Sequence, residues 1–284
     1  MGEYEVRNNP PSMKQPCREI IGVVPAGGKA SRVAPLPCSK ELYPVGFHPI
    51  GNGCSLRPKV VSQFMLENMR LANIKKAYII LREGKWDIPA YFKDGKSLNM
   101  HLAYLMMGLP FGVPYTLDQA YPFVQDALVA LGFPDMIVEP DDAFVRLLAK
   151  REDVNADIVL GLFSATQPQK TDMVELDEKG RVRAIRIKPA QTQLRYAWEI
   201  AIWTPVFTRL MHEFVLSRRE RDGNSSRMGL DERNEVHISD VIQVAIDGGM
   251  NVETVVFEQG NCLDIGTPED MLKAVRLQVN QKLA

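Results

Sequence analysis

Short apolar runs alternate with amphipathic segments through roughly the first 165 residues of this 284-residue chain. Strands that alternate with helices at this spacing predict βαβ units and a mainly parallel sheet flanked by helices. The chain is 45% hydrophobic and 24% charged, which is typical of a globular protein with one large domain. The sequence therefore predicts a Rossmann-like α/β fold.

The apolar spacing also places the individual elements. Buried strands are expected at 20–24, 76–81, 100–105, 136–138 and 158–163. Helices are expected at 58–69, 86–92, 119–131 and 144–149. In the third of these helices, Val124, Leu128 and Leu131 would share one face.

The pattern changes after residue 166. Two strands around the turn Asp177–Gly180, followed by a strand at 197–203, predict a small antiparallel excursion over 167–204. The remaining expected elements are a helix at 205–217, a mobile exposed loop at 218–233, a helix at 238–246 capped by Ser239, a strand at 252–257 and a last helix opening at 264–267. Residues 1–18 are expected to form a flexible N-terminal arm before one domain at 19–284.

A glycine-rich loop follows the first strand and reads Ala26-Gly27-Gly28-Lys29-Ala30-Ser31-Arg32. Glycine has no Cβ, so backbone N–H groups there can approach an anion closely. Three cations, Lys29, Arg32 and Lys40, lie on or just after the loop. The pattern suits a polyphosphate, although a simple Gly-Gly turn with solvated lysines is the more common reason for such a pattern. It has neither the P-loop spacing nor the dinucleotide-binding spacing.

Composition limits the partners and the compartment. With a net charge of -1, the chain has no overall positive charge of the kind that attracts nucleic acid or acidic membranes. The four cysteines form no C-x-x-C pair and no signal peptide opens the chain, which favours free thiols and a cytoplasmic location. No apolar run reaches the ~18 residues that span a bilayer. A homo-oligomer is compatible with the sequence.

Several motifs together carry a resemblance to a known family. Gly27-Gly28-Lys29-Ala30-Ser31-Arg32-Val33, Ser39-Lys40-Glu41-Leu42-Tyr43-Pro44-Val45 and Leu263-Asp264-Ile265-Gly266-Thr267-Pro268-Glu269 follow its signatures in order and spacing. The chain resembles the sugar-1-phosphate nucleotidylyltransferases, such as glucose-1-phosphate thymidylyltransferases and mannose-1-phosphate guanylyltransferases, over roughly residues 19–280. Ala30 stands where the family has glycine, and Ser39 where it has proline.

This resemblance implies a fold of the nucleotide-diphospho-sugar transferase type and transfer of a nucleoside monophosphate from an NTP to a sugar 1-phosphate. Arg32, Lys40 and Lys188 would be the catalytic cations, and Lys188 would hold the sugar phosphate. The residues expected to bind the nucleotide are Ala26, Gly27, Gly28, Lys29 and Gln119, the last reading the base edge.

The resemblance also implies Mg²⁺ as cofactor, with Asp141 and Asp264 as its ligands. Mg²⁺ takes one or two carboxylates plus phosphate oxygens, and Asp141 follows a predicted parallel strand, where ligands of α/β sheets bind. The plainer alternatives are a helix N-cap at Asp141, with Asp142 as its neighbour, and a strand-to-helix turn at Asp264.

Departures from the family pattern gather on the sugar side. Ile187 replaces the glutamate that would bond sugar hydroxyls, and Asp172 and Glu199 stand where small residues are usual. They motivate a second hypothesis, a non-catalytic regulatory paralogue that binds a nucleotide or a sugar phosphate. The base and the sugar stay open at this point.

Overall fold

The computed structural model describes residues 18–50, 55–108, 111–222 and 235–283. The strands are β1 (Ile20–Ala26), β2 (Pro44–Ile50), β3 (Ser55–Val60), β4 (Lys76–Leu81), β5 (His101–Met106), β6 (Leu128–Leu131), β7 (Met136–Glu139), β8 (Ile158–Ser164), β9 (Asp172–Leu176), β10 (Val182–Ile187), β11 (Tyr196–Trp203), β12 (Val252–Phe257) and β13 (Asn261–Asp264). The α-helices are α1 (Val61–Leu71), α2 (Asp87–Phe92), α3 (Val113–Leu117), α4 (Tyr121–Val124), α5 (Ala143–Val154), α6 (Pro205–Asp222), α7 (Ile238–Asp247) and α8 (Pro268–Leu283). The 3-10 turns are η1 (Lys40–Leu42), η2 (Lys96–Leu98), η3 (Asp118–Ala120) and η4 (Pro168–Lys170).

A nine-stranded mixed sheet forms the centre of the molecule, with the main order β10-β9-β11-β6-β1-β4-β5. Four adjacent strands, β6, β1, β4 and β5, run parallel. β11 joins them to the rest of the sheet by pairing antiparallel with β6, β8 and β9, and β12 runs parallel to β8. The predicted α/β fold class is confirmed.

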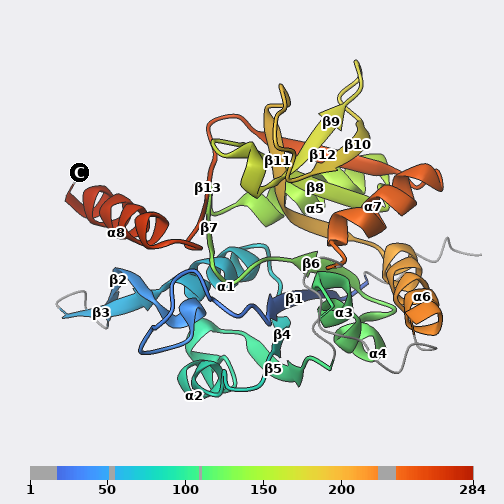
Figure 1. Ribbon diagram of the computed structural model, residues 1–284. Coiled ribbons are helices and arrows are strands. Elements are labelled where there is room, and N and C mark those ends of the chain that lie inside the picture. Colours follow the sequence, from blue (N-terminus) through green and yellow to red (C-terminus); the bar gives the residue numbers. More distant parts are fainter. Residues whose placement is uncertain (1–17, 51–54, 109–110, 223–234, 284) are drawn as a thin grey trace, which may run out of the picture.

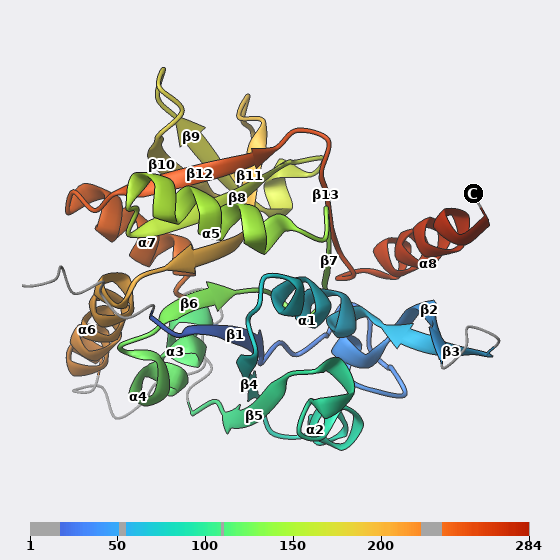
Figure 2. The same ribbon diagram turned by 180° about the vertical axis from the view of Figure 1, so that it is seen from behind.

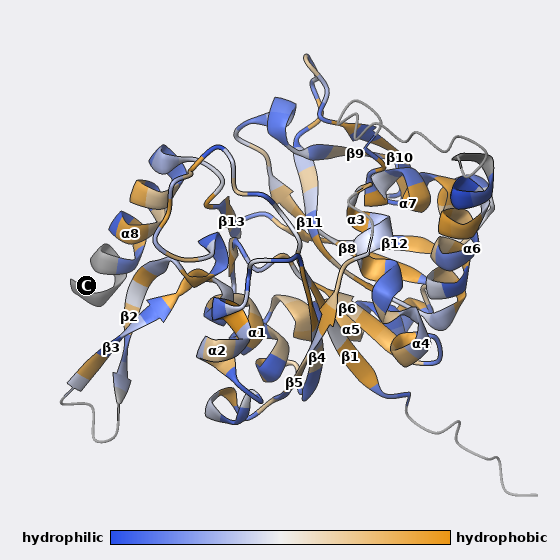
Figure 3. Ribbon diagram, turned by 60° about the horizontal axis from the view of Figure 1, so that its bottom comes forward, coloured by the Kyte–Doolittle hydropathy of each residue, from blue (hydrophilic) through white to orange (hydrophobic). Residues whose placement is uncertain are grey.

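Helices cover both faces of this sheet (Figures 1 and 2). Alternate residues of β1 face opposite sides, so that Val24 packs in a cluster with α1 and α5, and Val23 packs in one with α6 and α7. The central strand β1 is largely orange in the hydropathy colouring of Figure 3, because a sheet covered on both faces buries nearly every side chain of its central strands. No helix among the described residues is long and apolar enough to cross a membrane.

The prediction of a helix over 119–131 is wrong for its second half. Leu128–Leu131 is the strand β6, which lies in the sheet between β1 and β11. All four of its residues are buried, and a fully buried strand shows no alternation, so apolar residues at three- and four-residue steps imitated a helix. The loop after β6 therefore opens at the same sheet edge as the loop after β1.

Other expected elements differ in extent or pairing. Residues 58–60 belong to β3, which pairs with β2, because the helix begins only at Val61. β7 is not a parallel strand of the main sheet but pairs antiparallel with β13. α6 continues through residues 218–222, which were expected to be loop, and 223–234 lie outside the described residues, as does the N-terminal arm except residue 18.

The antiparallel excursion is present as the hairpin β9–β10, in which Ile187 lies opposite Asp172. It does not stand apart from the sheet, because β11 pairs with β9 at Ala197 and Met173. The helix α7 has His237 as its N-cap, and the backbone N–H of His237 donates to Asp240 Oδ2 at 2.9 Å. The predicted capping role of Ser239 is therefore wrong.

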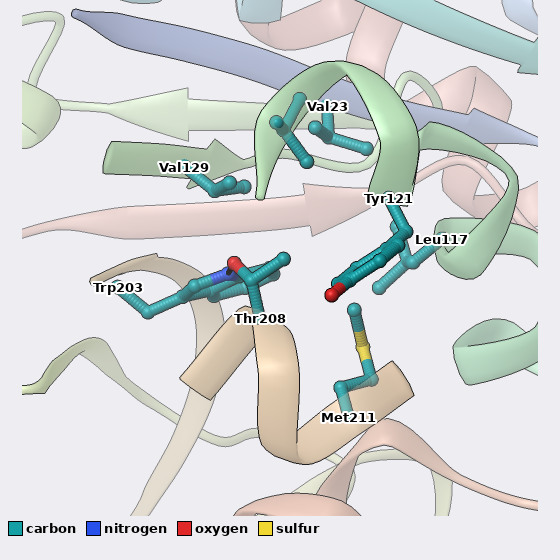
Figure 4. A pocket seen from close by; sticks show the side chains of 8 residues that line it. Val23, Leu117, Tyr121, Val129, Trp203, Thr208 and Met211 are labelled. Carbon is teal, nitrogen blue, oxygen red and sulfur yellow. Dashed lines mark hydrogen bonds between the residues drawn. The ribbon is translucent and has the colours of Figure 1, made fainter. Parts of the chain in front are cut away.

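A small apolar cavity lies between β1, β6, α4 and α6 (Figure 4). Thr208 and Tyr121 each contribute a hydroxyl, and that of Thr208 already accepts a hydrogen bond of 3.0 Å from Trp203 Nε1. The other lining residues are Val23, Leu117, Val124, Val129, Trp203 and Met211. The cavity offers little polar recognition, and we interpret it as a packing gap in the core.

Phe144 on α5 is fully buried against the sheet, whereas its neighbour Val145 is 41% exposed. Replacing Phe144 with alanine removes a packed ring and leaves a cavity, so the free energy of unfolding should fall by about 3–5 kcal/mol. Val145→Ala on the same helix is the control and should stay within about 0.5 kcal/mol. Urea denaturation measures both, and similar losses in the two variants would contradict this packing.

Candidate functional site

The glycine-rich loop begins where the central strand β1 ends, beside two parallel neighbours. A Cβ at Gly27 would lie 2.7 Å from Met107 Sδ, so the Met107 side chain packs closely over this glycine and would have to move for a larger residue. A Cβ at Gly28 would have no atom within 4 Å, and this residue is exposed. The backbone at Gly28 is therefore open to a ligand, at the sheet edge where α/β proteins bind them.

The first and last parts of the chain meet at this loop. A Cβ at Gly266, just after β13, would lie 2.8 Å from Arg32 Nη2 and 2.7 Å from Asp264 Oδ2. The lack of a side chain at Gly266 thus lets the Arg32 guanidinium approach Asp264. The structure brings together these two predicted site residues, which are more than 230 positions apart in sequence.

Lys40 is the centre of the site. Its ammonium lies 2.5 Å from Asp135 Oδ2 and 3.9 Å from Asp264 Oδ1, and only 11% of its side chain is exposed. Burial alone lowers the pKa of Lys40, but the charges of Asp135 and Asp264 outweigh burial and raise it. Lys40 is therefore a fixed positive charge between two carboxylates.

Asp264 carries an unusual carboxylate. Burial and the neighbouring Asp135 charge raise its pKa to about 6, although Lys40 and Arg32 oppose the shift. Its Oδ1 atom is buried and accepts no hydrogen bond from the described residues. Two close carboxylates with one unsatisfied oxygen fit a divalent cation, which prefers oxygen ligands. The described residues contain no group of three or more His, Cys, Asp or Glu side chains that could hold a metal.

Asp141, the other predicted metal ligand, lies elsewhere. In the β7–β13 ladder Asp264 is opposite Met136, while Glu139 is opposite Asn261. The three residue steps from Met136 to Glu139 span roughly 10 Å, and Asp141 lies beyond the Glu139 end of β7, exposed just before α5. The structure does not bring Asp141 to Asp264. The neighbouring Asp142 is the N-cap residue of α5, and its carboxylate pairs with Arg146 at 3.0 Å.

Asp135 is the carboxylate that sequence reasoning missed. It ends the segment Gly132-Phe133-Pro134-Asp135, which directly follows β6. Asp135 also places a carboxylate just after a buried strand, which is where ligands of α/β sheets bind. The signal was present, but the helical interpretation of 119–131 placed this segment after a helix.

The predicted base-reading residue lies near the loop. Gln119 Nε2 donates to the Tyr115 carbonyl at 3.3 Å, and its amide lies 3.8 Å from where a Cβ of Gly108 would be. Gly108 follows Met107, whose sulfur packs over Gly27. Gln119 is therefore linked to the glycine-rich loop through Met107 and Gly108, which follow β5.

Lys188 is exposed just after β10, in a left-handed backbone conformation with φ of 40°. Among the described residues it has no ion pair, and the structure does not join it to the Lys40 cluster. Its neighbour Ile187 is half-buried opposite Asp172. Asp172 accepts a hydrogen bond of 2.5 Å from Ser239 Oγ, which in turn accepts one of 2.9 Å from Trp198 Nε1.

Glu199 on β11 lies close enough to the carboxylates of Asp264, Asp172 and Asp135 to be affected by their charges. Burial, together with the charges of Asp264, Asp172 and Asp135, raises its pKa to about 8. Burial and the Glu199 charge also raise the pKa of the Cys262 thiol. Glu199 therefore keeps its proton at neutral pH unless a cation enters the site.

Sequence comparison shows the family of this chain. A profile of the nucleotidyl transferase family matches residues 21–281, and the chain belongs to that family. It is 25% identical over 92% of its length to Agl11, a low-salt glycan biosynthesis nucleotidyltransferase of Haloferax volcanii, and 26% identical over 90% to a glucose-1-phosphate thymidylyltransferase of Streptomyces griseus. These alignments cover 66% and 65% of the two relatives, so the chain spans about two thirds of their length.

Solved structures agree on the fold. A Bacillus anthracis structure assigned as a glucose-1-phosphate thymidylyltransferase, in complex with sucrose, has a TM-score of 0.72 and 18% identity, covering 91% of this chain and 95% of that one. A UDP-glucose pyrophosphorylase complexed with UDP-glucose has a TM-score of 0.71 and 13% identity, covering 93% and 99%. The fold is that of the nucleotide-diphospho-sugar transferases, as predicted.

Ala30 adopts φ of 53° at the position where the family has glycine. A left-handed conformation costs an L-residue about 1–2 kcal/mol. Glycine avoids this cost, but it lowers stability by about 0.4–1 kcal/mol because it gives the unfolded chain more conformational entropy. Ala30→Gly should therefore raise the free energy of unfolding by about 0.5–1 kcal/mol. Ala90→Gly, at an exposed position in α2, should lower it by a similar amount. Denaturant titration measures both, and a loss at position 30 would contradict the strain.

The raised pKa of Glu199 predicts a pH-dependent stability. Between pH 4.5, its ordinary pKa, and pH 8, its folded value, the unfolded chain loses a proton that the folded protein keeps, so stability falls as pH rises. Glu199→Gln removes this ionisation. Its unfolding free energy relative to wild type should therefore increase from pH 5 to pH 8, measured by denaturation with EDTA present. Glu178→Gln, in an exposed turn, is the control, and parallel pH profiles for Glu199→Gln and wild type would refute the assignment.

Proposed function

We propose that this protein transfers a nucleoside monophosphate from an NTP to a sugar 1-phosphate, which gives a nucleotide sugar and releases pyrophosphate. The observation that carries the proposal is the position of Lys40 between Asp135 and Asp264, beside the open glycine loop. Family membership and the name of the Streptomyces griseus relative support the same reaction.

Both substrates are anions, so the site must reduce their repulsion and align them. In the proposed reaction an oxygen of the sugar phosphate attacks the α-phosphorus of the NTP, and pyrophosphate leaves with the electrons of the broken P–O bond. Ala26, Gly27, Gly28 and Lys29 would surround the triphosphate, with Gln119 at the base. Arg32 and Lys40 would stabilise the negative charge on the transferring and leaving groups.

Asp135 and Asp264 would hold Mg²⁺, in place of the pair Asp141 and Asp264 expected from sequence. The buried, unsatisfied Oδ1 of Asp264 and the raised pKa of this carboxyl group fit a site that accepts another positive charge. When bound, the ion would shield phosphate oxygens from one another. Lys40 already neutralises part of the carboxylate charge, so it would keep the two side chains in place before the ion binds.

On the acceptor side, Lys188 would hold the phosphate of the sugar. The glutamate expected at Ile187 is missing, but Asp172 lies directly opposite Ile187 in the hairpin. Residues opposite each other in an antiparallel pair share a face, so a carboxylate still lies beside this position, with Oδ2 bonded by Ser239 and Oδ1 buried without a hydrogen-bond partner among the described residues. This arrangement favours an enzyme over the non-catalytic paralogue.

Purified protein should release pyrophosphate when it is given Mg²⁺, one of dTTP, UTP, GTP or CTP, and glucose 1-phosphate or mannose 1-phosphate. Pyrophosphate release depends on both substrates and is measured with a coupled phosphatase assay. Measurable binding of nucleotide or sugar phosphate without turnover by any pair would support the regulatory paralogue instead.

Asp135→Asn should lower kcat by at least about a hundredfold, because it removes a proposed metal ligand and the ion-pair partner of Lys40. Asp141→Asn is the matched control and should keep near wild-type turnover. Both proteins should retain the circular dichroism spectrum of wild type. Full activity of Asp135→Asn, or loss of activity confined to Asp141→Asn, would overturn the assignment.

A further inference from the structure

Lys40 lies in η1, a single turn of three residues. A turn this short has little rigidity of its own, yet it must hold the ammonium between two carboxylates from different parts of the chain. Both residues beside Lys40 make side-chain contacts with one segment, residues 85–87, which lies after β4 and includes the first residue of α2. We propose that Asp87 and Lys85 are positioning residues that clamp this turn and aim Lys40, an inference that rests on the function proposed above.

Ser39 makes the first contact of the clamp. Its backbone N–H donates to Asp87 Oδ2 at 2.6 Å, and its hydroxyl donates to Asp87 Oδ1 at 2.6 Å. The resemblance places proline at this position, and proline can make neither bond, since it lacks both the N–H and the hydroxyl. In place of a rigid proline ring, this chain has a serine that is held to Asp87 by two hydrogen bonds.

Glu41 makes the second contact. Its carboxylate forms a buried ion pair with Lys85, and the two residues are 3% and 8% exposed. The Glu41 carbonyl also accepts a hydrogen bond of 2.6 Å from Ser62 Oγ on α1. Removing one partner of a buried ion pair leaves an unpaired charge, so this contact is difficult to break. The turn is fixed on both sides of Lys40.

The segment that carries the clamp is itself well defined. The Lys85 backbone N–H bonds the carbonyl of Arg82, and Gly84 supplies the turn between them with φ of 92°. Asp87 is the first residue of α2, where an anionic side chain is favourable. Hydrogen bonds from Ser39 lower the pKa of Asp87 even though burial opposes them, so Asp87 stays ionised and accepts both bonds.

Asp87→Asn tests the clamp, because an NH2 group replaces one of the two acceptor oxygens and the negative charge that strengthens both hydrogen bonds is lost. A misplacement of about 1 Å can cost about a hundredfold in rate, so kcat should fall about 10- to 100-fold with KM for both substrates within about threefold. Ser39→Ala removes only the hydroxyl bond and should have a smaller effect of the same kind. Asp94→Asn, which changes an exposed carboxylate paired with Lys96, is the control and should leave kcat unchanged.

A double-mutant cycle separates positioning from general loss of stability. Ser39→Pro restores the ring expected from the resemblance and removes the need for Asp87. Asp87→Asn should therefore cost less than about twofold in kcat in the Ser39→Pro background. Additive losses in the double variant, or wild-type kcat in a folded Asp87→Asn protein, would overturn the proposal.

A second readout does not use turnover. Lys40 should react several-fold faster with an amine-acylating reagent in Asp87→Asn than in wild type, as measured by mass spectrometry, because its ammonium is no longer held against Asp135. Unchanged reactivity would count against the clamp. If the wild-type protein shows no pyrophosphate release, the proposed function fails, while faster acylation of Lys40 in the variant would still support the clamp. If Asp87→Asn does not fold, Ser39→Ala carries the same two measurements.

Discussion

The site depends on one buried ammonium group shared by two carboxylates. Lys40, Asp135 and Asp264 come from three separate segments, and without the lysine two neighbouring carboxylates would face each other in a partly buried place. Burial of a lysine disfavours its charge, but here the acidic partners more than compensate, and its pKa is raised. This group of three charges joins the signature loop, the end of β6 and the last strand.

The fold explains why these segments converge. β1, β4 and β6 run parallel, so the loops after β1 and β6 leave the sheet at the same edge. β13 returns to this place by pairing with β7, which follows Asp135 directly. One sheet edge therefore carries the glycine loop, both carboxylates and the turn 85–87 that holds the flanks of Lys40.

Local motifs were the part of the site that could be predicted from sequence. The glycine loop, Lys40 and Asp264 each lie in a run whose spacing marks it without reference to the rest of the chain, and the structure brings Arg32, Lys40 and Asp264 together. Asp135 was missed because the preceding strand is buried on both faces, and its spacing imitates a helix. Asp141 was preferred because β7 was expected to be a parallel strand of the main sheet. β7 instead pairs antiparallel with β13, and this pairing places Asp141 away from the site.

The sequence by itself determined the α/β class, the family and the loop that begins the site, because periodicity and short motifs are properties of contiguous residues. Only the tertiary structure decided which carboxylate accompanies Asp264, that Asp172 lies opposite Ile187, and that Asp87 holds Ser39 from 48 positions away. These are relations between segments. They depend on strand order and register, which the pairing of β6, β7 and β11 sets and which no single stretch of the chain encodes.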